Sequence, residues 1–120
     1  MDIKTVFGEY IRNRREKLRA EDRQYSLRQV ATKIGIEPSY LSRVERGEPT
    51  SLSEGKIISL AKVLGEDPDV LLALSGKISN EIQEIIRKRP NLFAQLIRDL
   101  KNLPDHAVLR IVREVRDGKW

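Results

Sequence analysis

The side chains best suited to chemistry in this chain lie between Pro38 and Arg46, where polar and basic residues alternate with apolar ones at helical spacing. Leu41 and Val44, three positions apart, define the buried side of a short helix. The opposite side then carries Ser39, Tyr40, Ser42, Arg43 and Arg46. Hydroxyl and guanidinium groups can hydrogen-bond base edges and phosphates, and arginine suits guanine O6 and N7. An exposed helix of this composition is of the kind that a DNA major groove accepts.

A second short helix is expected just before this one, with a glycine between them. Ser26 is a good N-cap, and Gln29 three residues later completes the pattern of a capping box. The apolar stripe of this helix consists of Val30, Ala31 and Ile34. Gly35 ends it, because only glycine enters the left-handed backbone region without steric cost. The pattern therefore predicts two helices joined by a tight turn.

Residues 5–76 resemble the Cro/cI-like (lambda-repressor-like, XRE) family of helix-turn-helix DNA-binding domains. The motifs that carry the resemblance are Val30-Ala31, Gly35-Ile36, Leu41-Ser42 and Val44-Glu45-Arg46-Gly47 at the family's spacing. The resemblance implies an all-α fold with a five-helix lambda-repressor-like domain, in which the helix from Pro38 to Arg46 reads DNA. It also implies that Arg15 of the first helix pairs with Glu45. A buried bidentate pair of this kind fixes helix orientation and does not read bases.

We predict base contacts from the start and the exposed face of the recognition helix, at Glu37, Pro38, Ser39, Tyr40 and Arg43. Glu37 and Pro38 also fit a structural role, because proline suits the first helical position and an acidic side chain suits the positive end of the helix dipole. Phosphate contacts are predicted from the preceding helix start, the recognition helix and the following loop, at Leu27, Arg28, Ser42, Arg46, Thr50, Ser51 and Ser53. The alternative role of the loop hydroxyls is helix capping, above all for Ser53.

The charged segment 19–25 lengthens the connection between the first two helices beyond the family's short turn, and we expect a solvated loop or an extra helical turn there. After the recognition helix, one helix is predicted from Glu54 to about Leu64. Another follows Asp67-Pro68, with Val70, Leu71, Leu72 and Leu74 as its apolar residues, and ends at Gly76. Residues 1–76 are therefore the predicted DNA-binding domain.

Residues 77–120 are predicted to form three more helices, interrupted at Pro90 and Pro104, each with an apolar stripe. A unit of this size can hardly bury such stripes alone, so it must pair with a second copy or pack on the first domain. Dimerisation is the stronger inference, because a two-fold dimer doubles the contacts onto half-sites about one helical turn apart.

Composition narrows the classes of protein that the chain can belong to. The chain has 120 residues, 39% of them hydrophobic and 34% charged, with a net charge of +5. Residues 1–47 hold 11 basic and 7 acidic side chains, which suits a polyanionic partner. The sequence has no cysteine and one histidine, His106, so neither a metal site nor a cofactor is predicted. No catalytic constellation, membrane span or signal pattern is recognisable, so we expect a cytoplasmic protein that is not an enzyme.

The function predicted from these features is sequence-specific binding of double-stranded DNA by a homodimeric repressor at an inverted-repeat operator. The alternative is an antitoxin-like or protease-controlled regulator, whose C-terminal helices bind a partner protein encoded nearby.

Overall fold

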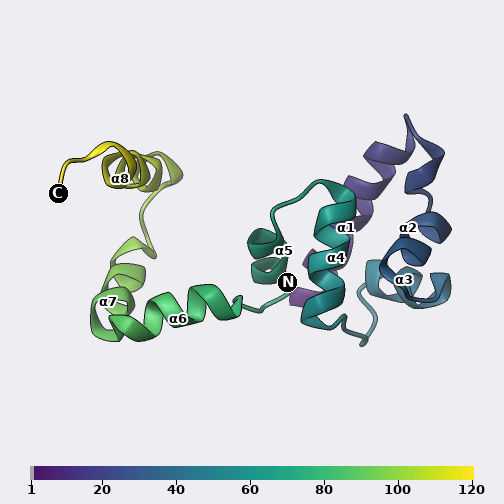
Figure 1. The fold of residues 1–120 in the computed structure, drawn as a ribbon, viewed down its shortest axis with the longest axis horizontal. Coiled ribbons are helices and arrows are strands. Elements are labelled where there is room, and N and C mark those ends of the chain that lie inside the picture. Colours follow the sequence, from purple (N-terminus) through teal and green to yellow (C-terminus); the bar gives the residue numbers. More distant parts are fainter. Residues whose placement is uncertain (1) are drawn as a thin grey trace. The chain divides into compact units, whose positions relative to one another are not determined.

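The computed structural model describes residues 2–120, and this part of the chain is all-helical (Figure 1). It contains eight α-helices, one short 3-10 helix and no strand, which confirms the predicted all-α fold class. The elements are α1 (Ile3–Arg19), the 3-10 helix η1 (Arg23–Tyr25), α2 (Leu27–Ile34), α3 (Pro38–Glu45), α4 (Glu54–Leu64), α5 (Pro68–Leu74), α6 (Asn80–Lys88), α7 (Pro90–Leu100) and α8 (Asp105–Asp117).

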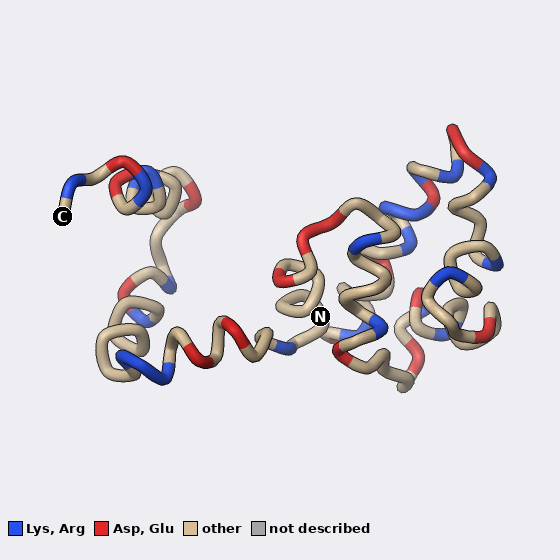
Figure 2. Tube along the Cα trace, in the orientation of Figure 1, with Lys and Arg blue, Asp and Glu red and all other residues tan. Residues whose placement is uncertain are grey.

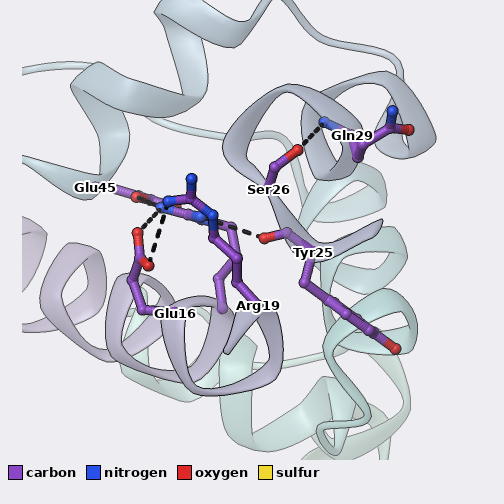
Figure 3. A network of polar contacts seen from close by, with 7 residues as sticks. Glu16, Arg19, Tyr25, Ser26, Gln29 and Glu45 are labelled. Atoms are coloured by element: carbon purple, nitrogen blue, oxygen red, sulfur yellow. Dashed lines mark hydrogen bonds and ion pairs between the residues drawn. The ribbon is translucent and has the colours of Figure 1, made fainter. Parts of the chain in front are cut away.

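Local signals in the sequence set the ends of most of these helices. Ser26 Oγ accepts a hydrogen bond from the backbone N–H of Gln29 at 3.2 Å, and Ser53 Oγ accepts one from Lys56 at 3.2 Å. These bonds satisfy N–H groups that the first turn of a helix leaves free. Gly35 ends α2 with φ 75°, in the left-handed region. The predicted N-caps Ser26 and Ser53 and the glycine turn between α2 and α3 are therefore confirmed, whereas the Gln29 side chain points away from Ser26 and does not close the capping box (Figure 3).

The chain divides into two compact units, the first ending at Ser79 and the second beginning at Asn80. The first unit has a continuous core, to which α1 to α5 and the segment before α4 contribute. Its buried apolar residues are Phe7, Ile11, Val30, Ala31, Ile34, Leu41, Val44, Leu52, Ile57, Leu60, Ala61, Leu64, Leu71 and Leu72. Because α3 packs on both α1 and α2, its position in the unit is fixed from two sides.

The second unit consists of α6, α7 and α8, as the proline breaks predicted. Its residues, 80–120, include none that is buried. The large apolar side chains that are most exposed include Leu92 at 66%, Val115 at 63% and Ile97 at 55%. The helices are therefore strongly amphipathic, and their apolar faces are only partly covered within the unit.

Of the apolar residues predicted for α5, Leu71 and Leu72 are buried, whereas the Val70 side chain is 47% exposed. Successive residues on a helix point about 100° apart, so a seven-residue helix buries one side only. The segment between α1 and α2 holds an extra helical turn, one of the two forms expected from the sequence, because Asp22 caps the 3-10 helix η1 by accepting a hydrogen bond from Gln24 N at 2.9 Å.

Candidate nucleic-acid interface

The face of α3 that points away from the core is polar and basic. Leu41 and Val44 are 0% and 4% exposed, so they anchor the helix. Ser39, Arg43 and Arg46 are exposed, while Ser42 is half-buried. The structure thus presents most of the predicted contact residues of this helix on one open side. Figure 2 shows the basic positions of α1, α2 and α3.

A buried ion pair attaches the C-terminal end of α3 to α1. Arg15 Nε donates to Glu45 Oε2 at 2.7 Å and Arg15 Nη2 donates to Glu45 Oε1 at 2.9 Å, and both side chains are 5% exposed. Arg15 also donates to Glu16 Oε1 at 3.0 Å and to the Tyr25 carbonyl at 3.3 Å (Figure 3). The hydrogen bond with Glu45 is the main cause of a raised pKa for Arg15, so the guanidinium stays charged. One side chain therefore fixes α3, α1 and η1 relative to each other.

Backbone contact holds the same two helices close together. Gly8 is buried in α1, and a Cβ placed there would lie 2.5 Å from the Val44 carbonyl oxygen and 2.7 Å from that of Glu45. Any other residue at this position would push α1 away from the C-terminal end of α3. Gly8 was not predicted from the sequence, because a single glycine inside a helical pattern gives no sign of what it faces.

A basic recess of about 250 Å³ lies where α1, the start of α2 and the end of α3 meet. It is lined by Arg12, Arg15, Glu16, Arg19, Leu27, Ser42, Glu45 and Arg46. Leu27 is the first residue of α2, where backbone N–H groups and the helix dipole favour an anion. Arg12 and Arg19 were not predicted as contacts. Their spacing from Arg15 on α1, three and four residues, is the signal that could have found them.

Arg46 is held within the protein by two side-chain hydrogen bonds. Its Nε donates to Glu48 Oε2 at 2.6 Å, and its Nη1 donates to Ser42 Oγ at 2.8 Å. Both members of the Arg46–Glu48 pair are exposed, with side chains 55% and 42% accessible. An exposed pair of this kind is weak, so a phosphate can compete for the guanidinium.

The segment from Glu48 to Ser53 joins α3 to α4 and has no regular secondary structure. Ser51 is exposed, whereas Ser53 is the N-cap of α4. Thr50 Oγ1 is buried and has no hydrogen-bond partner within residues 2–120. The structure therefore turns the Thr50 hydroxyl inward, and of the three predicted hydroxyl contacts here only those of Ser51 and Ser53 lie on exposed residues.

The start of α3 is open. Glu37 is its N-cap residue and makes no side-chain capping bond, and Pro38 occupies the first helical position. Tyr40 is half-buried and packs against the core, and its hydroxyl donates to the Ser51 carbonyl at 2.5 Å. Arg28, the second residue of α2, is exposed.

The part of the chain that the structure describes contains no group of three or more His, Cys, Asp or Glu side chains placed to hold a metal ion. None of the helices described is long and apolar enough to cross a membrane.

Comparison with known proteins agrees with this geometry. A family model described as a helix-turn-helix domain matches residues 6–74, which is more than half of the chain and spans the elements from α1 to α5. Searches of curated proteins and of solved structures gave no match.

Proposed function

Because the chain belongs to the helix-turn-helix domain family, a family of DNA-binding regulators, we propose that it is a sequence-specific transcriptional repressor that acts in the cytoplasm. The observation that carries the proposal is the open, basic side of α3, held in one orientation by the buried Arg15–Glu45 pair. A helix held in this way can enter the major groove with its side chains at defined positions. Bound at an operator, the protein would exclude other proteins from the same DNA.

Within this proposal, the α3 face reads bases and the surrounding residues hold the backbone. Arg43 is the principal reader, since a guanidinium can donate two hydrogen bonds to guanine O6 and N7, and Ser39, Glu37 and Pro38 lie at the leading end of the helix. Phosphates are held around it by the α2 start, by α3 and by the following loop, through Leu27, Arg28, Ser42, Arg46, Thr50, Ser51 and Ser53. Thr50 would contribute through its backbone, because its hydroxyl is buried. The recess adds Arg12 and Arg19 to this set.

The second unit is proposed to join two copies of the chain. Its helices expose large apolar side chains, and water-exposed apolar surface of this kind favours association. A two-fold dimer would present two recognition helices to an inverted repeat, which matches the symmetry of such operators. The alternative is that these apolar faces bind a partner protein.

Selection of bound duplexes from a random DNA pool tests the proposal. The full-length protein should enrich an inverted repeat, whereas Leu92→Asp/Leu96→Asp should retain a single half-site with weaker binding. The matched control is Asn91→Asp/Gln95→Asp, which adds the same charge at the same spacing on α7 without touching Leu92 or Leu96. Sedimentation should show a dimer for the wild type and the control only. Failure of the wild type to enrich any sequence would contradict sequence reading, and a wild-type monomer would favour the partner-protein alternative.

Two arginine variants separate base reading from phosphate binding. Arg43→Ala should cost about 1–3 kcal/mol on the selected duplex and relax the preference at one base pair. Arg46→Ala should weaken binding to selected and random duplexes alike and make the slope of log K against log salt less steep by about one. Equal losses on both duplexes for Arg43→Ala would remove it from the base-reading set.

A further inference from the structure

Tyr40 lies between the two parts of the proposed interface and contacts both. Its hydroxyl donates a 2.5 Å hydrogen bond to the carbonyl oxygen of Ser51, in the loop that follows α3. The centroid of its ring is 5.4 Å from the guanidinium carbon of Arg43, a cation–π contact on the exposed side of α3. The ring is half-buried and packs against the core of the first unit, so it is a fixed platform.

The contact with Ser51 ties the segment 48–53 directly to α3. Residues 48–53 form no helix or strand; Leu52 is buried in the core, and Lys77 Nζ donates to the Leu52 carbonyl at 2.9 Å. The hydrogen bond from Tyr40 to the Ser51 carbonyl adds a direct restraint on the distance between α3 and the loop. Since phosphate contacts fix the register of a protein on DNA, that distance matters for binding to any sequence.

The contact with Arg43 restrains the side chain proposed to read bases. Within residues 2–120, Arg43 has no ion pair, and the Tyr40 ring is the group that limits where its guanidinium lies. An arginine that is free to rotate loses side-chain entropy when it forms a bidentate contact, whereas one resting on an aromatic face is partly ordered beforehand.

From these contacts we propose that Tyr40 is a positioning residue, which orders Arg43 for base recognition through its ring and holds the Ser51 loop for phosphate binding through its hydroxyl. Tyr40 was predicted from the sequence as a base contact. The structure gives its hydroxyl an acceptor within the protein, so the specificity that depends on Tyr40 acts through Arg43. This inference rests on the proposed function.

Two substitutions separate the two roles. For each, the affinity of the full-length protein is measured for the duplex recovered by selection and for a random duplex of equal length. Tyr40→Phe keeps the ring and loses the hydroxyl, so binding to both duplexes should weaken by about three- to tenfold with the preference unchanged. Tyr40→Leu loses the ring as well, so the preference for the base pair read by Arg43 should fall by a further two- to fivefold or so. Circular dichroism confirms that each variant is folded.

The decisive measurement compares the base preference of the two variants in the Arg43→Ala background, where Tyr40 has no Arg43 side chain to position. There, Tyr40→Leu and Tyr40→Phe should show the same base preference at every position. A loss of preference from Tyr40→Phe alone would show that the hydroxyl reads a base, and an added loss from Tyr40→Leu in the absence of Arg43 would show direct ring readout. Both results overturn the inference, as does a Tyr40→Leu variant with unchanged preference. If the wild type itself does not distinguish the two duplexes, the proposed function fails first.

Discussion

Removal of the Arg15 side chain should destabilise the first unit strongly and change base preference much less. In Arg15→Ala, the Glu45 carboxylate, 5% exposed, would lose two charge-assisted hydrogen bonds of 2.7 and 2.9 Å and remain largely buried. Loss of one partner from a buried pair costs about 3–5 kcal/mol. The Tyr25 carbonyl would lose its donor as well. Because domains of this size are stable by about 5–15 kcal/mol, such a loss is a large part of the total.

A matched exposed pair on the same helix supplies the control. Arg19 lies 3.6 Å from Glu16, with both side chains about half exposed at 54% and 43%. Arg19→Ala should therefore cost less than about 1 kcal/mol of stability. Since Arg19 lines the basic recess, this variant should instead weaken binding to all duplexes. The two arginines are thus expected to show opposite patterns, one in folding and one in binding.

Urea denaturation followed by far-ultraviolet circular dichroism measures the stability of each full-length variant. Fluorescence would not serve, because the single tryptophan, Trp120, follows α8 in the second unit and is 89% exposed. Arg15→Met/Glu45→Leu should recover much of the loss, since apolar residues of similar volume leave no buried charge. A loss below about 1 kcal/mol for Arg15→Ala, together with a weaker preference for the selected duplex, would refute the structural role.

Three further perturbations test separate features. Glu48→Gln releases Arg46 from its 2.6 Å pair, so affinity for selected and random duplexes should rise together by about two- to fivefold in fluorescence anisotropy; unchanged affinity would mean that Arg46 does not bind phosphate. The hydrogen bond from Tyr10 to Glu66, 3.0 Å long, raises the pKa of Tyr10 above its ordinary value near 10. Its neutral form is therefore favoured in the folded state, and this contribution to stability is present below about pH 10 and is lost as the pH rises through the raised pKa. Tyr10→Phe should abolish that alkaline dependence in urea denaturation, and an unchanged dependence would assign it elsewhere. Gly8→Ala should lower stability by about 1–3 kcal/mol, since its Cβ would lie 2.5 Å from a backbone oxygen, and a neutral result would show that α1 can shift freely.

Local patterns in the sequence were sufficient for the helices and for the exposed side of α3. The spacing of Leu41 and Val44 determines which side of α3 is buried, and Ser26 and Gly35 determine where α2 begins and ends. These are effects of neighbouring residues, and periodicity reports them directly. The HTH family match over residues 6–74 then agrees with the resemblance that the same motifs indicated.

Features that depend on distant parts of the chain could not be predicted in the same way. The contact of Gly8 with the end of α3 and the gathering of Arg12 and Arg19 beside the α2 start arise only after the helices have packed. Likewise, no local signal shows that the Thr50 hydroxyl turns inward or that the Tyr40 hydroxyl bonds to Ser51. Side-chain type identified candidate contacts, whereas tertiary packing decides which atoms remain available to DNA.

The way α3 is attached determines how the operator preference of this protein can evolve. The helix is fixed at its C-terminal end by Glu45 and along its side by Leu41, Val44 and Tyr40, whereas the Glu37 side chain at its start makes no capping bond. Exposed residues without such attachments usually change stability by no more than about 0.5 kcal/mol when they are substituted. The leading end of the helix can therefore acquire new side chains without a folding penalty. New operator preferences can arise there one substitution at a time, while the scaffold that aims the helix remains unchanged.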